Sequence, residues 1–330
     1  MADRNTPDPA RADVPEHTPD GPDPVERRWR RPLDESLRDA YLRRLGWTAP
    51  PPPTAETLVA LHRAHVERVP YEVVWIALGE SRTVEPLESV RHVVAGRGGY
   101  CYHLNGAFAC LLDWLGFDVH WRVGGVQLLR ESEPFRARAN HLALEVHGLP
   151  SAASPEGRWF VDTGLGDALH EPLPLVPGGV EQPPSRFALR RSAVVPGGWR
   201  LDHDPRGYFV GMDFTSSEAT VPDFAAMHEK LSTAPDSGFV RVVSVCRRDG
   251  RSVSTLRGLR YTELRAESTT QTAITTKAQY FAVLADVFGL PLSDVDDQRR
   301  AALWAHLLAA HERYLAERAD RVDSTVGGTQ

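Results

Sequence analysis

The spacing of apolar residues predicts helices in the N-terminal part of the chain. Leu37, Tyr41 and Leu45 recur at helical intervals, and Gly46 after them is a typical helix stop. Three more stretches keep this period, with apolar stripes at Leu58, Leu61 and His65, at Leu87, Val90 and Val94, and at Leu104, Phe108, Leu111, Leu112 and Leu115. We therefore expect a helical bundle over residues 33–116.

The pattern changes after Gly116 to one that is typical of strands. Alternating residues, or stretches rich in Val, Leu, Trp and Phe, occur at 118–129, 141–147 and 158–163. Residues 171–200 hold short apolar pieces between prolines and glycines, as small strands joined by turns do. These features predict an antiparallel, β-barrel-like domain over residues 117–225.

Residues 226–330 combine both patterns and predict an α/β lid. The hairpin-type turn Asp249-Gly250 joins two expected strands, at 239–247 and 253–262. Two helices are expected to follow, one over Gln279–Phe288 that stops at Gly289, and one that begins near Ser293 with Asp296 in an approximate capping box. The expected fold class is therefore α+β.

Composition narrows the class of protein. Residues 1–32 contain seven prolines and thirteen charged residues without apolar periodicity, which predicts a disordered tail. The whole chain is 42% hydrophobic and 25% charged, as expected for a globular enzyme, and no apolar run approaches the length of a membrane span. A net charge of −6 argues against a nucleic-acid partner. Without an apolar signal core at the N-terminus, we expect a cytoplasmic protein.

The cysteines raise the question of a nucleophile. Cys101, Cys110 and Cys246 are too few for a disulfide framework and their spacing suits no metal site. Cys101 follows Gly98-Gly99 and begins a helical stretch, where the helix dipole and unpaired amides favour a thiolate and can hold an oxyanion. The other two cysteines lie in apolar surroundings and are expected to be structural.

A nucleophilic cysteine needs a base and a group that orients it. His141 begins one expected strand and Asp162 ends the next, with a turn-rich loop of about ten residues between them. Pairing outward from that loop brings position 141 beside positions 162–164. The pattern therefore predicts a Cys-His-Asp arrangement like that of cysteine proteases, with Asp167 as an alternative to Asp162.

Five segments, in one order along residues 36–292, carry a resemblance to a known family: Val69-Pro70-Tyr71-Glu72; Arg97-Gly98-Gly99-Tyr100-Cys101 with Asn105; Asn140-His141-Leu142; Val161-Asp162-Thr163-Gly164-Leu165-Gly166; and Ser232-Thr233-Ala234-Pro235-Asp236-Ser237-Gly238-Phe239. The chain resembles the arylamine N-acetyltransferases. That resemblance implies a helical domain, a β-barrel-like domain and an α/β lid.

The resemblance also implies a chemistry. Cys101 would accept an acyl group from acetyl-CoA, His141 would act as base and acid, and Asp162 would orient His141. The acceptor would be an arylamine, an arylhydrazine or an N-hydroxyarylamine, and no metal is expected. Residues expected near substrate or cosubstrate are Tyr71, Tyr102, Gly124, Gly125, Ser232, Ser237 and Phe239. The protein is expected to be a monomer or a homodimer.

The chain departs from the family at several positions, and rival functions stay open. Tyr71-Glu72-Val73 replaces the family's usual Phe-Glu-Asn, His103 replaces a usual Glu or Gln, and the 148–157 loop is longer. The nearest rival is a natural-product amide synthase that takes its acyl chain from an acyl carrier protein. Such a partner would need a basic patch, for which the candidates are Arg27, Arg28, Arg30 and Arg31, or Arg247, Arg248 and Arg251. Two more distant rivals are a Cys-His-Asp hydrolase or transglutaminase-like enzyme, and an inactive binding module.

Overall fold

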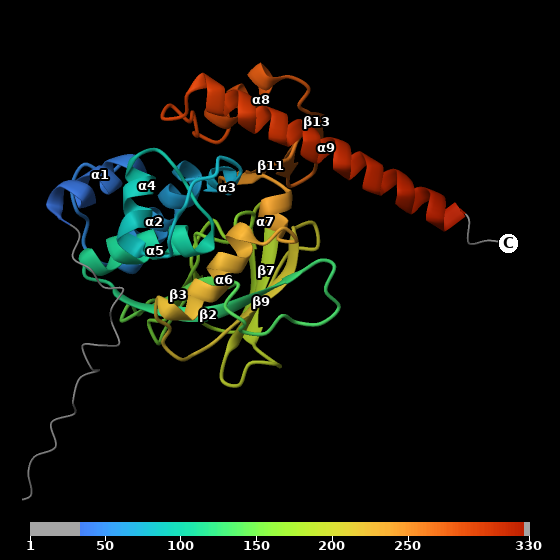
Figure 1. Cartoon of the computed structure of the whole chain (residues 1–330). Helices are drawn as coiled ribbons and strands as arrows, with labels where there is room; N and C mark the ends of the chain where they lie inside the picture. The colour runs from blue at the N-terminus through green and yellow to red at the C-terminus, as the bar shows by residue number, and fades with distance from the viewer. Residues whose placement is uncertain (1–33, 327–330) are drawn as a thin grey trace, which may run out of the picture.

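The computed structural model describes residues 34–326, and the side chains as far as Glu317. The tail predicted for residues 1–32 lies outside the described residues. In Figure 1, a group of N-terminal helices lies beside a curled antiparallel sheet, and the C-terminal segment covers the junction between them. The predicted α+β class and the barrel-like sheet are confirmed. Among the described residues, no helix combines the length and apolarity needed to cross a bilayer.

The N-terminal helices begin and end where their capping residues predict. Asp34 accepts a hydrogen bond from the Leu37 amide at the start of the first helix, and Gly46 ends that helix with a left-handed φ of 87°. The helices of this part are α1 (Glu35–Leu45), α2 (Ala55–Arg68), the one-turn α3 (Val74–Ala77), α4 (Pro86–Val94) and α5 (Cys101–Trp114).

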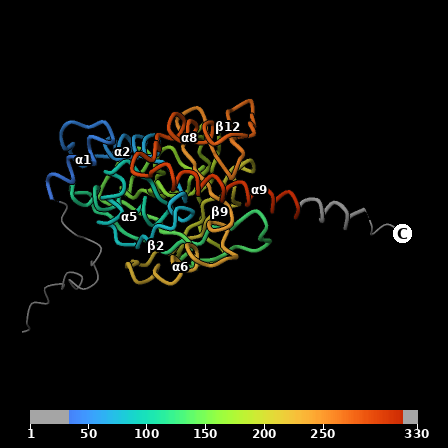
Figure 2. Tube along the Cα trace, turned by 45° about the horizontal axis from the view of Figure 1, so that its top comes forward, coloured from blue at the N-terminus to red at the C-terminus, as the bar shows by residue number. Residues whose placement is uncertain are grey.

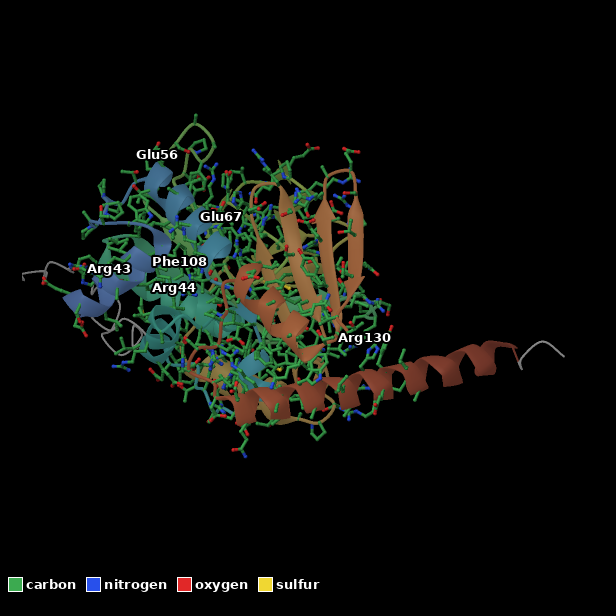
Figure 3. All side chains as sticks on the ribbon, turned by 90° about the horizontal axis from the view of Figure 1, so that it is seen from above. Arg43, Arg44, Glu56, Glu67, Phe108 and Arg130 are labelled. Atoms are coloured by element: carbon green, nitrogen blue, oxygen red, sulfur yellow. The ribbon has the colours of Figure 1, made fainter. Side chains whose placement is uncertain are left out.

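The central helix α5 is buried nearly all round. Every residue from Cys101 to Leu112 is buried, although the sequence predicts a single apolar stripe. Polar side chains such as Asn105 and His103 are therefore inside the protein, where they need hydrogen-bond partners. The helix packs on α4 and on the first strands of the sheet, and Phe108 lies among the N-terminal helices in Figure 3.

The large sheet has eight antiparallel strands in the order β5-β4-β3-β2-β9-β8-β7-β6. These are β2 (Asp118–Leu128), β3 (His141–His147), β4 (Trp159–Val161), β5 (Leu173–Pro174), β6 (Gly178–Gln182), β7 (Ser185–Arg191), β8 (Trp199–Asp202) and β9 (Phe209–Phe214). Val119, Trp121 and Leu144 join the core around α5. Ala143 and Phe160 belong to a second core, inside the curl of the sheet. The sheet therefore holds the ends of β3 and β4 against the start of α5.

A second sheet has five strands in the order β1-β10-β11-β12-β13. They are β1 (Tyr71–Glu72), β10 (Ser244–Arg248), β11 (Ser252–Arg257), β12 (Arg260–Arg265) and β13 (Thr269–Ala273). β1 comes from the N-terminal part and pairs with β10, so this sheet joins two distant regions of the chain. Helices α6 (Pro222–Thr233), α7 (Gly238–Arg241), α8 (Lys277–Asp286) and α9 (Asp297–Val326) complete this part. α9 passes the sheet and extends beyond it (Figures 1 and 2).

Three predicted elements of the C-terminal part are corrected by the structure. The expected strand 253–262 is two strands, because Gly258 adopts a φ of 55° and turns the chain between them. The expected strand 239–247 begins only at Ser244, since the residues before it form α7. The last helix begins at Asp297 and not near Ser293, because Asp296 accepts a hydrogen bond from the Arg299 amide and caps it.

Helix α6 is not predicted by the sequence pattern. Only Phe224 and His228 of its twelve residues are buried, so its apolar stripe is too thin to recognise. It packs beside the start of α5 through aromatic contacts, including one between the rings of Phe224 and Tyr102, 5.4 Å apart. The helix therefore belongs to the surroundings of Cys101.

Candidate active site

The glycine pair before α5 allows another segment to approach Cys101 closely. A Cβ atom on Gly98 would lie 1.9 Å from the Pro70 carbonyl oxygen, so only glycine fits there. The Glu72 amide donates to the Gly99 carbonyl at 2.8 Å. The loop is thereby tied to β1, and Cys101 is the first residue of α5, with 3% of its surface exposed.

The structure brings Cys101, His141 and Asp162 together. Nε2 of His141, at the start of β3, lies 2.7 Å from Oδ2 of Asp162, just after β4. The Cys101 side chain is close enough to the His141 ring to affect the pKa of that ring. The Cys101 sulfur lies 3.7 Å from the carbonyl oxygen of Asn140. Since Nε2 faces the carboxylate, Nδ1 is the ring nitrogen left for the thiol.

The charge on this site favours a protonated His141. Burial of the ring lowers its pKa, but the neighbouring Asp162 carboxylate and Cys101 outweigh that effect and raise the pKa of His141 to about 10. The ring is an imidazolium near neutral pH. Such a ring has the proton that a leaving group would need, and it stabilises negative charge on the sulfur beside it.

Asn105 holds Asp162 in place. Its Nδ2 donates to Oδ1 of Asp162 at 2.8 Å and to the Leu142 carbonyl at 2.6 Å, and its Oδ1 accepts from the Thr163 amide at 2.8 Å. The Gly164 amide also donates to Asp162, at 2.9 Å from Oδ1. Asp162 is therefore fixed by His141 on one oxygen and by Asn105 and Gly164 on the other.

Gly164 is required for the approach of this loop to α5. A Cβ atom on residue 164 would lie 2.6 Å from Cα of Cys101, which no side chain could occupy. This contact explains the glycine in the motif Asp162-Thr163-Gly164, because the loop crosses directly over Cys101. The backbone next to Asp162 and the start of α5 are thus in contact without an intervening side chain.

His62 supports the Asp162 backbone and has no distinguishing signal in the sequence. On α2, its Nε2 lies 3.1 Å from the Asp162 carbonyl oxygen and its Nδ1 lies 3.0 Å from the His170 carbonyl oxygen. Burial lowers the pKa of His62 to about 4, so the ring is neutral and donates from one nitrogen. The helical spacing of α2 places this histidine on the buried face, but no pattern links it to residues about 100 positions away.

Asp167 does not take the role considered for it as an alternative to Asp162. Its Oδ1 lies 3.6 Å from Nε2 of His203, and its Oδ2 accepts from the Tyr208 amide at 2.8 Å. The carboxylate is therefore committed to the segment before β9, while His141 bonds Asp162.

Four aromatic side chains surround the start of α5, and we call them the aromatic group: Tyr71, Tyr100, Tyr102 and Phe239. The rings of Tyr100 and Phe239 are 5.2 Å apart, and those of Tyr71 and Phe239 are 6.5 Å apart. Burial and the neighbouring Cys101 raise the pKa of Tyr71 above its ordinary value, so the hydroxyl keeps its proton. Tyr102 is buried and donates to the Ala139 carbonyl. Tyr71 and Phe239, both half-buried, are the members of this group within reach of solvent.

Gly124 and Gly125, expected near substrate or cosubstrate, lie within β2. Gly124 pairs with His141 and with Phe214, and a Cβ atom there would lie 3.1 Å from Cβ of His141. Gly125 lies against the Arg136 carbonyl, 1.3 Å from where a Cβ atom would be. The two glycines thus permit close packing next to His141 and the 136–140 segment.

The two predicted serines bond to the backbone. Ser232 Oγ donates to the His228 carbonyl at 2.8 Å, within α6. Ser237 Oγ donates to the Leu231 carbonyl at 2.6 Å and accepts from the Phe239 amide as the cap of α7. Ser237 therefore orients Phe239 within the aromatic group.

The other cysteines are separate from this arrangement. Cys110 is buried in the middle of α5. Cys246 lies in β10, where burial raises the pKa of its thiol to about 12 and the sulfur contacts Thr255 Oγ1 at 3.7 Å. All three cysteines are free of disulfides.

Arg97 ties the loop before Cys101 to the C-terminal part. Its Nη1 lies 2.8 Å from Oδ2 of Asp294, and its Nη2 lies 3.1 Å from Oε2 of Glu80. Glu80 also pairs with Arg299 of α9, at 3.2 Å. These ion pairs connect the loop before Cys101 with α9 and the segment that precedes it.

A cavity among the described residues lies beside this site and not on it. It measures about 770 Å³ and is lined by residues of β11–β13, α7 and α9. Its lining includes three arginines and two tyrosines: Arg241, Arg257, Arg260, Tyr208 and Tyr314. Arg257 is close enough to Tyr71 and Cys246 to lower the pKa of both, against the raising effect of burial. Arg257 thus acts electrostatically on Tyr71 as well as lining the cavity.

Comparisons with known proteins place these features in context. Residues 54–297 match the model of an N-acetyltransferase family. An arylamine N-acetyltransferase of Mycolicibacterium smegmatis is 30% identical over 271 residues, which cover 79% of this chain and 96% of that protein. Proansamycin X synthase of Amycolatopsis mediterranei is 31% identical over 157 residues, which cover 46% of this chain and 57% of that protein. The structure of a Mycobacterium marinum arylamine N-acetyltransferase in complex with CoA superposes with a TM-score of 0.71 at 25% identity, covering 81% of this chain and 97% of that one.

Proposed function

The chain belongs to the arylamine N-acetyltransferase family. We propose that it transfers an acetyl group from acetyl-CoA to an aromatic amine, and that Cys101 carries the acetyl group between the two. The acceptor class includes arylamines, arylhydrazines and N-hydroxyarylamines. The observation that carries the proposal is the buried Cys101 beside the His141–Asp162 pair, at the start of α5.

In the first half-reaction, Cys101 attacks the thioester carbonyl of acetyl-CoA. The sulfur forms a bond to the carbonyl carbon, and the carbonyl oxygen takes the negative charge. The amides of Cys101 and Tyr102, in the first turn of α5, are the donors we assign to this oxyanion, because first-turn amides lack intrahelical acceptors. One such donor contributes roughly 3 kcal/mol to transition-state stabilisation. CoA then leaves with the proton from His141, and the acetyl group remains on Cys101.

In the second half-reaction, an amine nitrogen attacks the acetyl carbon. His141 accepts a proton from that nitrogen, and the Cys101 sulfur leaves as the amide forms. Asp162 keeps the ring oriented through both steps, as the orienting carboxylate of a catalytic triad does. Tyr71 and Phe239 offer aromatic faces for a planar acceptor, and Cys101 is nearly inaccessible, so water competes poorly for the acetyl group.

We place the phosphate-bearing end of CoA in the cavity lined by Arg257 and Arg260. Guanidinium groups bind phosphates bidentately, and three arginines line this cavity. Tyr208 and Tyr314 in the same lining suit an adenine ring. The proximity of Arg257 to Tyr71 lets the thioester arm extend from the cavity toward Cys101.

Replacing Arg257 with alanine is therefore expected to raise the KM for acetyl-CoA about tenfold or more, because a charge-assisted bond to phosphate is worth about 1.5–3 kcal/mol. The maximal rate of Cys101 acetylation should stay close to that of the wild type. Arg265→Ala is the matched control, since Arg265 lies on β12 outside the cavity lining. Equal KM values for acetyl-CoA in the two variants would contradict the assignment of the CoA phosphates to this cavity.

A second candidate keeps the chemistry and changes the donor. This candidate is the natural-product amide synthase that takes its acyl chain from a carrier protein, and one of the similar proteins, proansamycin X synthase, is by its name a synthase. One predicted docking patch is weakened by the structure, because Arg248 is 2% exposed and donates to the Ala168, Gln182 and Pro183 carbonyls. Arg247 and Arg251 of that patch remain outside the core, whereas Arg27, Arg28, Arg30 and Arg31 lie outside the described residues.

Donor choice tests the function directly. Purified protein incubated with free acetyl-CoA is expected to gain one acetyl mass, mapped by peptide mass spectrometry to Cys101. Addition of an arylamine should then remove that mass and give the acetylated amine. Acylation only by a carrier-bound chain would support the amide synthase instead. Loss of the acetyl mass in buffer alone, at the same rate as with amine, would support the hydrolase.

A further inference from the structure

A cluster of histidine and carboxylate side chains lies far from Cys101, at the other end of β3. Asp118 and His120 alternate on one face of β2, and their cross-strand partners on β3 are His147 and Glu145. His141 begins β3 and His147 ends it, so about 20 Å of extended chain separates the two ends. The cluster is close to the segment that leads into α6 (Figure 1). It takes no part in the proposed acetyl transfer.

The ligand atoms of Asp118, His120 and His147 lie within 4.8 Å of one another. No other set of three His, Cys, Asp or Glu side chains between residues 34 and 317 gathers its ligand atoms in this way. The two imidazole rings are 4.2 Å apart between centroids and tilted by 32°. Two imidazoles and one carboxylate form the donor set that zinc and its transition-metal neighbours prefer.

One ring nitrogen of each imidazole is hydrogen-bonded to a glutamate carboxylate. Nδ1 of His120 lies 2.9 Å from Oε2 of Glu218, and Nε2 of His147 lies 2.8 Å from Oε2 of Glu145. Carboxylates that accept from one ring nitrogen fix the tautomer and make the other nitrogen a better metal ligand. Arg158 also contacts His147 Nε2, at 3.4 Å, but its shorter contact is with Glu145, at 2.8 Å.

The second ring nitrogen of His120, Nε2, faces the Asp118 carboxylate. This nitrogen is buried and lies 3.2 Å from Oδ2 of Asp118. Two metal bonds of about 2.0–2.1 Å at a tetrahedral angle separate their ligand atoms by about 3.3 Å. The observed separation therefore fits a cation placed between the two atoms.

A second, independent feature is the buried Glu145. Its side chain is fully buried, and its Oε1 has no hydrogen-bond partner among the described residues. Glu145 pairs with Arg122 and Arg158 through its other oxygen, Oε2. Oε1 is thus a buried acceptor without a described donor, on the cross-strand partner of His120.

We propose that Asp118, His120 and His147 bind a transition-metal ion of the zinc and nickel class, with Glu218 and Glu145 orienting the two imidazoles. The bound ion would link β2 to β3 and, through Glu218, to the segment that enters α6. It acts on the stability of the fold and not on the reaction at Cys101. The sequence predicts no metal, because the ligands come from two strands, Asp118 and His120 from β2 and His147 from β3.

The test uses the full chain without a histidine tag, as the Cys101→Ala variant, so that the reactive thiol does not bind the probe. After treatment with a chelator, calorimetric titration with Zn²⁺ is expected to show one ion bound per chain and an increase in Tm. Mg²⁺ is expected to show neither effect, because it prefers oxygen donors. Equal binding of Mg²⁺ would reduce the cluster to a nonspecific anionic patch and overturn the proposal.

Variants identify the ligands. Asp118→Asn changes an exposed side chain, so the protein should fold normally, and we expect it to weaken Zn²⁺ binding at least about tenfold. His120→Ala should weaken it further, and Glu218→Gln by about 10–100-fold. His92→Ala is the matched control, because His92 pairs with one carboxylate, Glu88, on a half-exposed helix face. Absence of Zn²⁺ binding, or unchanged affinity in both Asp118→Asn and His120→Ala, would contradict the site.

Discussion

Replacing Cys101 with alanine is expected to lower kcat/KM for acetyl transfer by about four orders of magnitude or more, because no other described thiol adjoins His141. The variant should still bind acetyl-CoA, since the arginines assigned to its phosphates are unchanged. Intact-protein mass spectrometry after incubation with acetyl-CoA should show no acetyl adduct. An active Cys101→Ala enzyme would refute a covalent mechanism on this residue.

Cys110→Ala is the matched control for that experiment. Both cysteines lie on α5 and both are buried, but Cys110 is further along the helix, in the core. Removing its sulfur should cost about 1 kcal/mol of unfolding free energy, because a small cavity forms in a packed interior. Its rate of acetyl transfer should match that of the wild type. A selective loss of rate in Cys110→Ala would reverse the assignment of nucleophile.

The second large effect is expected for Asp162→Asn, which should lower kcat by about 10⁴ while preserving the shape of the site. An asparagine amide facing His141 Nε2 would donate instead of accept, and so would hold the ring in the wrong tautomer. The unaltered Oδ1 could still accept from Asn105 and Gly164. Asp167→Asn is the control, because Asp167 bonds His203 and Tyr208. An equal loss of kcat in both variants would indicate general disruption of the loop.

A pH titration tests whether Asp162 raises the pKa of His141 in addition to fixing the tautomer of its ring. In the wild type the pKa of His141 is raised from the ordinary 6.5 to about 10, against the opposing effect of burial. The imidazolium therefore stabilises the folded protein fully below pH 6.5, and this contribution is lost as the pH rises through about 10. In Asp162→Asn the ring should lose its proton at a much lower pH. NMR of the His141 ring checks this, and an unchanged titration would exclude Asp162 as the cause.

The local elements of the fold could be predicted because their signals are close together in the sequence. Asp34 and Gly46 mark both ends of α1, and Pro86 marks the start of α4. The adjacency of His141 and Asp162 follows from counting outward along one hairpin, whose register pairs Leu144 with Val161. These inferences need only neighbouring strands or single turns, so the sequence is sufficient for them.

The other features of the fold and of the candidate site depend on contacts that sequence spacing does not encode. His62 supports Asp162 from about 100 residues away, and nothing on α2 distinguishes it from an ordinary buried histidine. The full burial of α5 is produced by the sheet on one side and α4 on the other, so the apolar stripe alone understates it. Gly258 within an otherwise strand-like stretch is compatible with one strand or two, and its positive φ makes it a turn. In each case the deciding contact is made by a distant part of the chain or by the backbone itself.

The pairing of β1 with β10 constrains the order in which the protein can be completed during synthesis. Glu72 pairs with Val245, and the same residue's amide bonds to Gly99 next to the nucleophile. A ribosome releases the N-terminal helices long before β10 exists, and long-range strand pairing forms slowly. The nascent chain therefore carries β1 without its β10 partner until the second sheet emerges, and the ion pair between Arg97 and Asp294 forms later still.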